Sequence, residues 1–173
     1  MEKQTCPFGP AFRRERKAND LSQWTIAMRL HNHLRNIQRI ESGAQQPGVT
    51  LALRLIEAAE ANPGEFLLRL WEESTGEGCV HHSCVEVAYE NPPAQPGIKT
   101  LYGPLLFQAR KTVGLSQTAM AKKADYNLRN INAVEKGLQE PGIMAALTLV
   151  GVTGVDIKNF FNKLFEFETA KNL

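Results

Sequence analysis

Hydrophobic positions recur at helical spacing along most of this 173-residue chain. Leu34, Ile37 and Ile40 follow one another at intervals of three, and aliphatic residues at positions 128, 131 and 134 repeat the pattern. Such spacing places apolar side chains on one side of a helix and polar side chains on the other. The pattern therefore predicts two amphipathic helices that lie 94 positions apart.

These two helices belong to a longer internal repeat. The chain reads LRNIQRIESGAQQPG over residues 34–48 and LRNINAVEKGLQEPG over residues 128–142. With the offset held at 94, the match extends without a gap from Phe8-Gly9-Pro10, which falls on residues 102–104, to Phe66 and Leu70, which fall on residues 160 and 164. A gapless match of this length indicates a tandem duplication of one supersecondary unit.

Each copy is predicted to hold five short helices. Pro10 and Pro104 suit the first turn of a helix, and Ser22 and Ser116 suit the cap of the second. Glycine, asparagine and proline signals place the remaining boundaries. The first helix then ends near residues 18 and 113, the third at Gly43 and Gly137, the fourth follows Gly48 and Gly142, and the fifth begins near Pro63 and Asp156. We expect an all-α fold with domains at residues 8–74 and 101–168.

Residues 75–100 read as a linker because they are rich in Gly, Pro and small polar residues. The alternation in CVEVAY, residues 84–89, predicts a short strand, so the linker would hold a small β-hairpin or lend a strand to a partner chain. A zinc site at Cys79, His81, His82 and Cys84 is the competing interpretation. It is disfavoured because adjacent histidines cannot easily both turn toward one ion.

Composition narrows the classes of function. The chain has 43% hydrophobic and 22% charged residues and a net charge of +2, which is ordinary for a globular protein. It has no membrane-length apolar run and no secretory signal pattern, which predicts a cytoplasmic protein without a membrane partner. Three cysteines do not suggest a disulfide framework. Catalytic motifs such as a phosphate-binding glycine loop are absent, so we expect neither an enzyme nor a cofactor.

Both copies resemble the Cro/C1-type helix-turn-helix family, also called the xenobiotic-response-element family. The resemblance rests on Gln followed at fixed distances by an aliphatic residue, Ala, Ile, Glu, Gly and Pro. These are Gln23, Ile26, Ala27, Ile37, Glu41, Gly43 and Pro47 in the first copy, and Gln117, Met120, Ala121, Ile131, Glu135, Gly137 and Pro141 in the second. The family usually has Gly-aliphatic-Ser at the turn, whereas the copies read His-Asn-His and Asp-Tyr-Asn at residues 31–33 and 125–127.

The resemblance implies a sequence-specific regulator of transcription that binds double-stranded DNA, in the form of a compact repressor carried by a phage, plasmid or similar mobile element. Each copy would read one of two similar half-sites. In the alternative interpretation one copy binds DNA and the other serves dimerisation or protein docking. A monomer and a homodimer both remain open, since a linker of about 26 residues has a random-coil span of about 28 Å.

The third helix of each copy would carry the base-reading side chains, because the second helix of the motif enters the major groove. Arg35 and Arg129 are the first candidates, since arginine bonds guanine O6 and N7 together. Arg39 is the second, and its counterpart Ala133 could touch only a thymine methyl. The other predicted DNA-binding residues lie on or beside the same two helices. They are Gln38 and Asn132 on the exposed side, His33, Leu34, Asn127 and Leu128 at the start, Gln23 and Gln117 on the preceding helix, and Ser42, Gln45, Lys136 and Gln139 beyond the end.

Two further arginines are expected to be structural. The family resemblance implies that Arg16 pairs with Glu41 and that Arg110 pairs with Glu135, which would join the first helix of each copy to the third. A guanidinium and a carboxylate form a two-point hydrogen-bonded pair that suits a partly buried position.

Overall fold

The computed structural model describes residues 6–76, 84–92, 98 and 100–171. Over these residues the chain forms ten α-helices and no strand, in two halves of five helices each. The first half holds α1 (Phe8–Ala18), α2 (Gln23–Arg29), α3 (Leu34–Glu41), α4 (Val49–Ala58) and α5 (Pro63–Thr75). The second holds α6 (Tyr102–Thr112), α7 (Gln117–Lys123), α8 (Leu128–Glu135), α9 (Ile143–Gly151) and α10 (Ile157–Lys171). The all-α fold and the five helices per copy are confirmed.

Local capping explains most of the helix boundaries. The Ser22 hydroxyl accepts a hydrogen bond from the Thr25 amide at 2.9 Å, and the Ser116 hydroxyl accepts one from the Ala119 amide at 3.0 Å. These bonds satisfy amide groups that the first turn leaves without a helical partner. Only the first helix of each copy departs from expectation. It begins two residues before the predicted proline, because the first turn of a helix tolerates a missing N–H at several positions.

A glycine in the first helix of each half allows that helix to touch the third. A Cβ atom built on Gly9 would lie 2.1 Å from the carbonyl oxygen of Ile40, and one on Gly103 would lie 1.7 Å from that of Val134. Both distances are far below any real contact, so a larger residue would force the helices apart. The repeated glycine is therefore a packing requirement of the helix-turn-helix unit.

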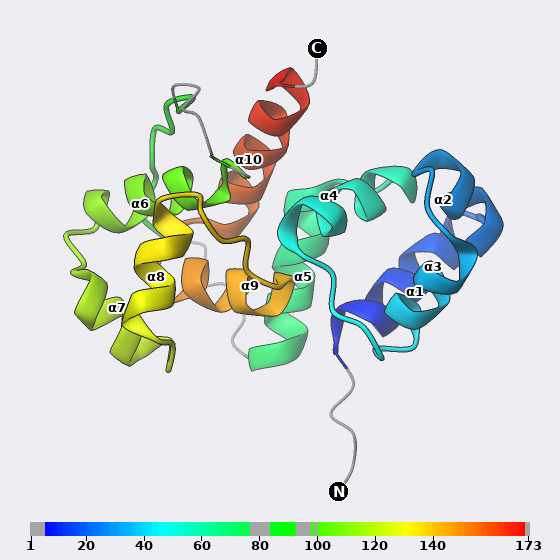
Figure 1. Ribbon diagram of the computed structural model, residues 1–173, viewed down its shortest axis with the longest axis horizontal. Helices are drawn as coiled ribbons and strands as arrows, with labels where there is room; N and C mark the ends of the chain where they lie inside the picture. Colours follow the sequence, from blue (N-terminus) through cyan, green and yellow to red (C-terminus); the bar gives the residue numbers. More distant parts are fainter. Residues whose placement is uncertain (1–5, 77–83, 93–97, 99, 172–173) are drawn as a thin grey trace, which may run out of the picture.

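The two halves pack directly against each other. Helix α5 lies along α10 and α4 meets α9, and these four helices occupy the middle of the molecule (Figure 1). The Ile143 amide donates to the Pro47 carbonyl at 3.0 Å, and the Gly64 amide donates to Asn162 Oδ1 at 3.0 Å. A built interface, and not the linker alone, holds the two halves together. Whether residues 8–74 and 101–168 are independent domains stays a prediction.

The interface pairs residues with their own counterparts in the repeat. Gly48 forms an antiparallel bridge with Gly142, which stands 94 positions later. A Cβ atom on Gly64 would lie 2.4 Å from the carbonyl oxygen of Lys158, again its counterpart. Reciprocal contacts show that the rotation is a half-turn: a Cβ atom on Gly48 would lie 2.9 Å from the Glu140 side chain, and one on Gly142 would lie 2.9 Å from that of Gln46, the counterpart of Glu140. The two halves are therefore related by a pseudo-twofold axis that passes through the Gly48–Gly142 and Gly64–Lys158 contacts.

Part of the linker lies against the second half as an extended segment, residues 84–92, which we call the strap. Val85 forms a single parallel bridge with Val155, Val87 is buried, and the Tyr89 ring meets Phe160 edge-on at 5.5 Å between ring centres. The predicted hairpin is absent from the described residues, because the strap pairs with the α9–α10 turn instead of folding back on itself. Residues 77–83, 93–97 and 99, which complete the linker, lie outside the described part.

Candidate DNA-binding surface

A buried ion pair ties the helix-turn-helix unit of the first half to α1. Arg16 donates from Nε to Glu41 Oε1 at 2.6 Å and from a terminal nitrogen to Oε2 at 2.9 Å, and it also donates to the Leu21 carbonyl. Gln23 Nε2 donates to Glu41 Oε2 at 2.7 Å, so α2 joins the same network. Hydrogen bonds to Glu41 raise the pKa of Arg16, which keeps the buried pair charged.

The second half repeats this network atom for atom. Arg110 donates to both carboxylate oxygens of Glu135, at 2.5 and 2.8 Å, and to the Leu115 carbonyl at 2.7 Å. Gln117 Nε2 donates to Glu135 Oε2 at 2.7 Å. Hydrogen bonds to Glu135 likewise raise the pKa of Arg110. The structural role predicted for both arginines is confirmed.

The network also defines what the two motif glutamines can still bind. An amide nitrogen carries two hydrogens, and Gln23 and Gln117 each use one of them on a buried carboxylate. Both side chains remain half-exposed with one N–H and the amide oxygen left over. Contact of these glutamines with a DNA phosphate stays a prediction.

The turn before α3 and the turn before α8 both contain a residue with left-handed backbone where the resembled family usually has glycine. His31 and Asp125 take positive φ values of 48° and 47°, the left-handed conformation that glycine adopts most easily. Asn32 Oδ1 accepts from the His33 amide at 2.8 Å, and Asn127 Oδ1 accepts from the Arg129 amide at 2.8 Å. The turn between the two helices therefore forms in both halves without glycine.

The predicted base-reading arginines are accessible. Arg35, Arg39 and Arg129 are exposed, and in the part of the chain that the structure describes their guanidinium groups form no hydrogen bond or ion pair. Gln38 is also exposed, whereas Asn132 and Ala133 are half-buried. At the helix starts, His33, Asn127 and Leu128 are exposed and Leu34 is half-buried. The surface of α3 thus offers two free guanidinium groups and the surface of α8 offers one.

The predicted DNA-binding residues that follow α3 and α8 differ from one another in exposure and in hydrogen bonding. Lys136 and Gln139 are exposed and Gln45 is half-buried. The Ser42 hydroxyl donates to the Arg39 carbonyl at 3.0 Å, so it would have to rotate to donate to a phosphate. Of this group, Lys136 is the best placed for a phosphate contact because it carries a charge and is exposed.

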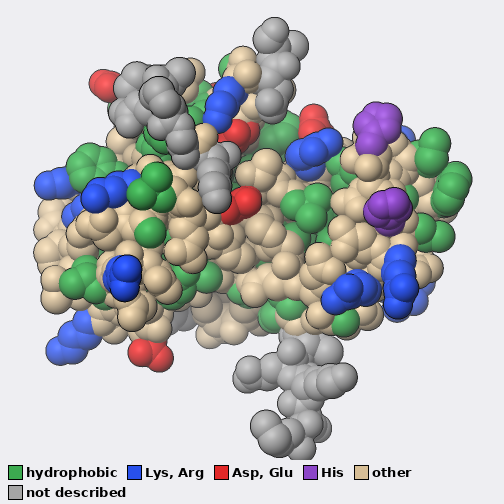
Figure 2. All heavy atoms as spheres, viewed as in Figure 1, with side chains coloured by type: hydrophobic (Ala, Val, Ile, Leu, Met, Phe, Trp, Pro, Cys, Tyr) green, Lys and Arg blue, Asp and Glu red, His purple; other side chains and the backbone are tan. Residues whose placement is uncertain are grey.

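Several cations elsewhere on the surface have acidic partners. Arg14, Arg29, Arg69, Lys158 and Lys163 each form an ion pair with a glutamate. By contrast, no ion pair within the described residues involves the cations of α3, α7 and α8 or the lysine after α8. These are Arg35, Arg39, Lys122, Lys123, Arg129 and Lys136. Figure 2 shows Lys and Arg side chains at both ends of one face, where the two helix-turn-helix units lie.

Sequence reasoning missed two features of this surface. Lys122 and Lys123 at the end of α7 are exposed, and α7 packs against α8. Trp24 and Met28, one turn apart on α2, expose 62% and 58% of their surface, and their counterparts are Thr118 and Lys122. The signal was available, because the counterparts Thr118 and Lys122 are polar, which indicates that these two positions face solvent.

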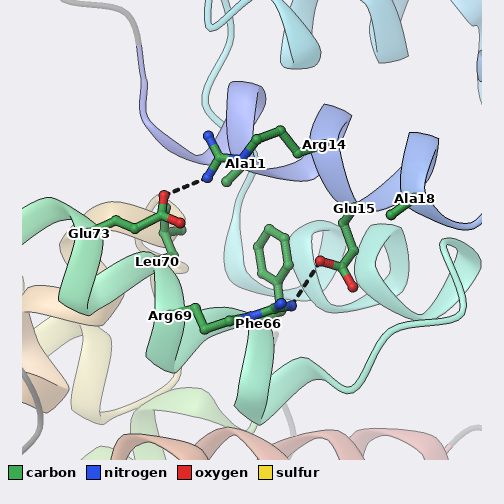
Figure 3. Close-up of a pocket in the computed structure, with 8 residues that line it drawn as sticks. All are labelled: Ala11, Arg14, Glu15, Ala18, Phe66, Arg69, Leu70 and Glu73. Carbon is green, nitrogen blue, oxygen red and sulfur yellow. Dashed lines mark hydrogen bonds and ion pairs between the residues drawn. The ribbon is translucent and has the colours of Figure 1, made fainter.

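A small pocket lies between α1 and α5 (Figure 3). It measures about 180 Å³ and is bridged by Arg14–Glu73 at 2.5 Å and Arg69–Glu15 at 2.8 Å. Its volume is below the roughly 300 Å³ at which small-molecule sites begin. Ion pairs occupy its charged groups, so we interpret it as a structural seam.

Two features are absent from the described residues: a cluster of metal-ligating side chains and a helix that could span a membrane. No group of three or more His, Cys, Asp or Glu side chains there could hold a metal ion, although Cys79, His81 and His82 of the zinc interpretation lie outside them. No described helix is long and apolar enough to cross a bilayer.

Comparisons with known proteins add no family. No protein-family model matches the chain, and neither a curated protein nor a solved structure matches it. What can be inferred about function therefore depends on the geometry of the two five-helix halves.

Proposed function

We propose that this chain is a sequence-specific transcriptional regulator, acting as a repressor, that binds double-stranded DNA with both helix-turn-helix units. One observation carries the proposal: in each half, a helix braced by the buried Arg–Glu–Gln network presents an exposed arginine whose guanidinium has no partner among the described residues. Exposed arginines elsewhere are mixed: glutamates hold Arg14, Arg29 and Arg69, whereas Arg13 and Arg54 have no ion pair among the described residues. The support therefore lies in the matched positions of Arg35 and Arg129, each the second residue of its helix. Free guanidinium groups at the start of a recognition helix match what major-groove reading requires.

The proposal assigns each surface a task. Arg35 and Arg129, the second residues of α3 and α8, would bond guanine at equivalent places in two half-sites. Arg39 would read a further base pair in one half-site, where Ala133 offers only a methyl group to the other. Lys122, Lys123 and Lys136 would contact phosphates and supply affinity that does not depend on sequence.

A footprint of the purified chain on DNA upstream of its own gene tests the proposal. We expect protection of two related half-sites, together with weaker binding when either half-site is scrambled. Equal affinity for the natural and a fully scrambled duplex would remove sequence-specific regulation as the function. The comparison must be made at one fixed salt concentration, because phosphate contacts alone change affinity strongly with salt.

The alternative, in which one unit docks a protein, draws support from Trp24 and Met28. Large exposed apolar side chains are enriched at protein interfaces, and the second half has no such pair at the equivalent place. Replacing them with the second half's own residues, Trp24→Thr with Met28→Lys, separates the two functions. Unchanged or tighter DNA binding supports the main proposal, whereas loss of a partner with intact DNA binding would favour docking.

A further inference from the structure

We infer that the interface between the halves dictates one kind of target, an inverted repeat with a single spacing, bound by one chain. The inference rests on the proposed function and goes beyond it by fixing the orientation, spacing and stoichiometry of the site. Two similar half-sites could otherwise be arranged as direct or inverted repeats, at any distance that a linker allows.

The orientation follows from the pseudo-twofold axis. Gly48 meets Gly142 and Gly64 meets Lys158, and two such counterpart contacts define the line about which one half rotates onto the other. Rotation about a line leaves the height of every point along that line unchanged. Helices α3 and α8 therefore lie at the same level along the axis, at opposite ends of the molecule (Figure 1).

Rotation by half a turn also reverses the direction of the second reading helix. DNA presents equivalent groove edges in reversed direction only when the second half-site is inverted, so the operator mirrors the protein's twofold symmetry. A direct repeat would require the halves to be related by a translation along the DNA. The contacts between counterparts exclude a translation.

The spacing is fixed because packed atoms hold the halves. Besides the backbone bond between Ile143 and Pro47, the ring of Trp71 lies so close to Gly151 that a Cβ atom there would come within 2.4 Å of it. Helix α5 lies along α10 over much of its length. Such an interface does not slide as a flexible linker does, so the two reading helices keep one separation.

The interface also favours the pairing of a first half with a second half over the pairing of two identical halves. Lys158 Nζ bonds Glu65 Oε1 at 2.9 Å, but the counterpart of Lys158 is a glycine and the counterpart of Glu65 is an asparagine. Two second halves would bring two lysines to the axis without a glutamate. Two first halves would place Trp71 against Glu57 instead of Gly151. One chain thus forms the complete unit.

Selection from a random pool of DNA duplexes by the full chain tests the inference. We expect the enriched duplexes to share two related elements in inverted orientation at one spacing, with one chain per duplex by native mass spectrometry. Synthetic versions with one element inverted, or with about 5 bp inserted between the elements, should lose affinity by about 10²-fold or more.

The outcomes separate the inference from the proposed function. Enrichment of direct repeats or of several spacings, or two chains on each inverted repeat, would overturn the inference while leaving sequence-specific binding in place. Enrichment of no sequence would overturn the proposed function itself.

A variant of the interface gives an independent check. Gly151→Leu should push Trp71 away and release the halves, so the inserted 5 bp would cost far less affinity, while binding to a single element stays unchanged. The matched control is the counterpart substitution Glu57→Leu, where a side chain is already accommodated. A Gly151→Leu protein that keeps the full spacing penalty would contradict the inference.

If the Gly151→Leu protein does not fold, cleavage of the linker tests the same inference. A protease site placed within residues 77–83 separates the chains of the two halves without changing the interface. We expect the cut protein to remain one complex and to keep the spacing penalty. Loss of the penalty on cutting would show that the linker sets the geometry, which contradicts the inference.

Discussion

The two halves of this molecule agree in their interiors and differ on their exposed surfaces. Gly9 and Gly103 allow the same helix crossing, and the Arg16–Glu41 pair has its counterpart in the second half. The halves diverge at outward positions of the repeat. Arg39 corresponds to Ala133, and Trp24 corresponds to Thr118. Packing limits what interior positions can hold, whereas the outward positions can specialise.

The seam between the first and last helix shows two solutions to one problem. Phe66 lies in the seam of the first half, which the Arg14–Glu73 and Arg69–Glu15 ion pairs bridge (Figure 3). Its counterpart Phe160 is covered by Tyr89 of the strap instead. The first half therefore closes this seam with exposed charges, and the second closes it with an apolar segment of the linker.

The largest effect should come from the part that the halves share. Arg16→Ala and Arg110→Ala each leave a buried glutamate without its partner, so we expect either to lower the free energy of unfolding by about 3–5 kcal/mol. Urea unfolding followed by circular dichroism measures it. The control replaces the whole pair by apolar residues, Arg16→Met with Glu41→Leu, and should recover much of the loss. A cost below about 1 kcal/mol for both single changes would show that the pairs are not structural.

The strap should contribute more to the free energy of unfolding than the ion pairs that close the equivalent seam of the first half. Tyr89→Ala removes a partly buried ring from Phe160 and should cost about 2 kcal/mol of unfolding free energy. Glu73→Gln removes an exposed ion pair from the first half and should cost about 0–1 kcal/mol. The same urea experiment measures both. Equal losses of unfolding free energy for the two variants would mean that the strap does not stabilise the second half more than a surface ion pair does.

Base reading should distinguish the halves by sequence. Arg35→Ala and Arg129→Ala should each remove about 1–3 kcal/mol of discrimination between the preferred and a scrambled half-site, at unchanged melting temperature. Arg39→Ala should relax preference in one half-site alone, because its counterpart is already alanine. Titrations against duplexes with single half-site changes test this. An equal fall in affinity for all sequences would make these arginines phosphate contacts.

Alkaline pH should weaken the second half selectively. Burial and then the nearby charge of Asp156 raise the pKa of Tyr89 above its ordinary value near 10, and among the described residues its hydroxyl has no hydrogen-bond partner. The folded state then keeps a proton that the unfolded state releases, so this stabilisation is present below pH 10 and declines as the pH rises above it. Unfolding midpoints measured across that range should fall less steeply in Tyr89→Phe. Parallel curves for the two proteins would contradict the assignment.

The smallest effect concerns a single charge. Lys136→Ala should reduce the salt dependence of binding by about one phosphate contact for every DNA sequence. Its counterpart Ser42→Ala carries no charge and should leave the salt slope unchanged. Affinity measured over a series of salt concentrations tests the pair. A loss confined to the preferred sequence would instead place Lys136 on a base.

The sequence predicted what short-range spacing determines. Helix order, the Ser22 and Ser116 caps and the left-handed glycines after α3 and α8 depend on neighbouring residues, and they were predictable. The strap and the pseudo-twofold axis were not. They depend on contacts between residues about 70 to 100 positions apart, and the alternation in residues 84–89 says nothing about which surface will receive it.

The candidate site was predictable in the same uneven way. The helical period of the sequence predicted which arginines are accessible. The hydrogen bond from Gln23 to Glu41 was not predictable, because it depends on how α1, α2 and α3 meet. Trp24 was overlooked because an apolar residue on a helix is ordinarily assigned to the core.

The contact between Gly64 and Lys158 has a consequence for how the protein can change. In a homodimer, a residue on the symmetry axis faces an identical copy of itself, so any substitution there happens twice and must suit both sides. Here the two sides are separate positions in one gene. A lysine has been accommodated at one of them because a glycine faces it and a neighbouring glutamate neutralises it. Each half is thereby free to acquire substitutions that its twin does not share.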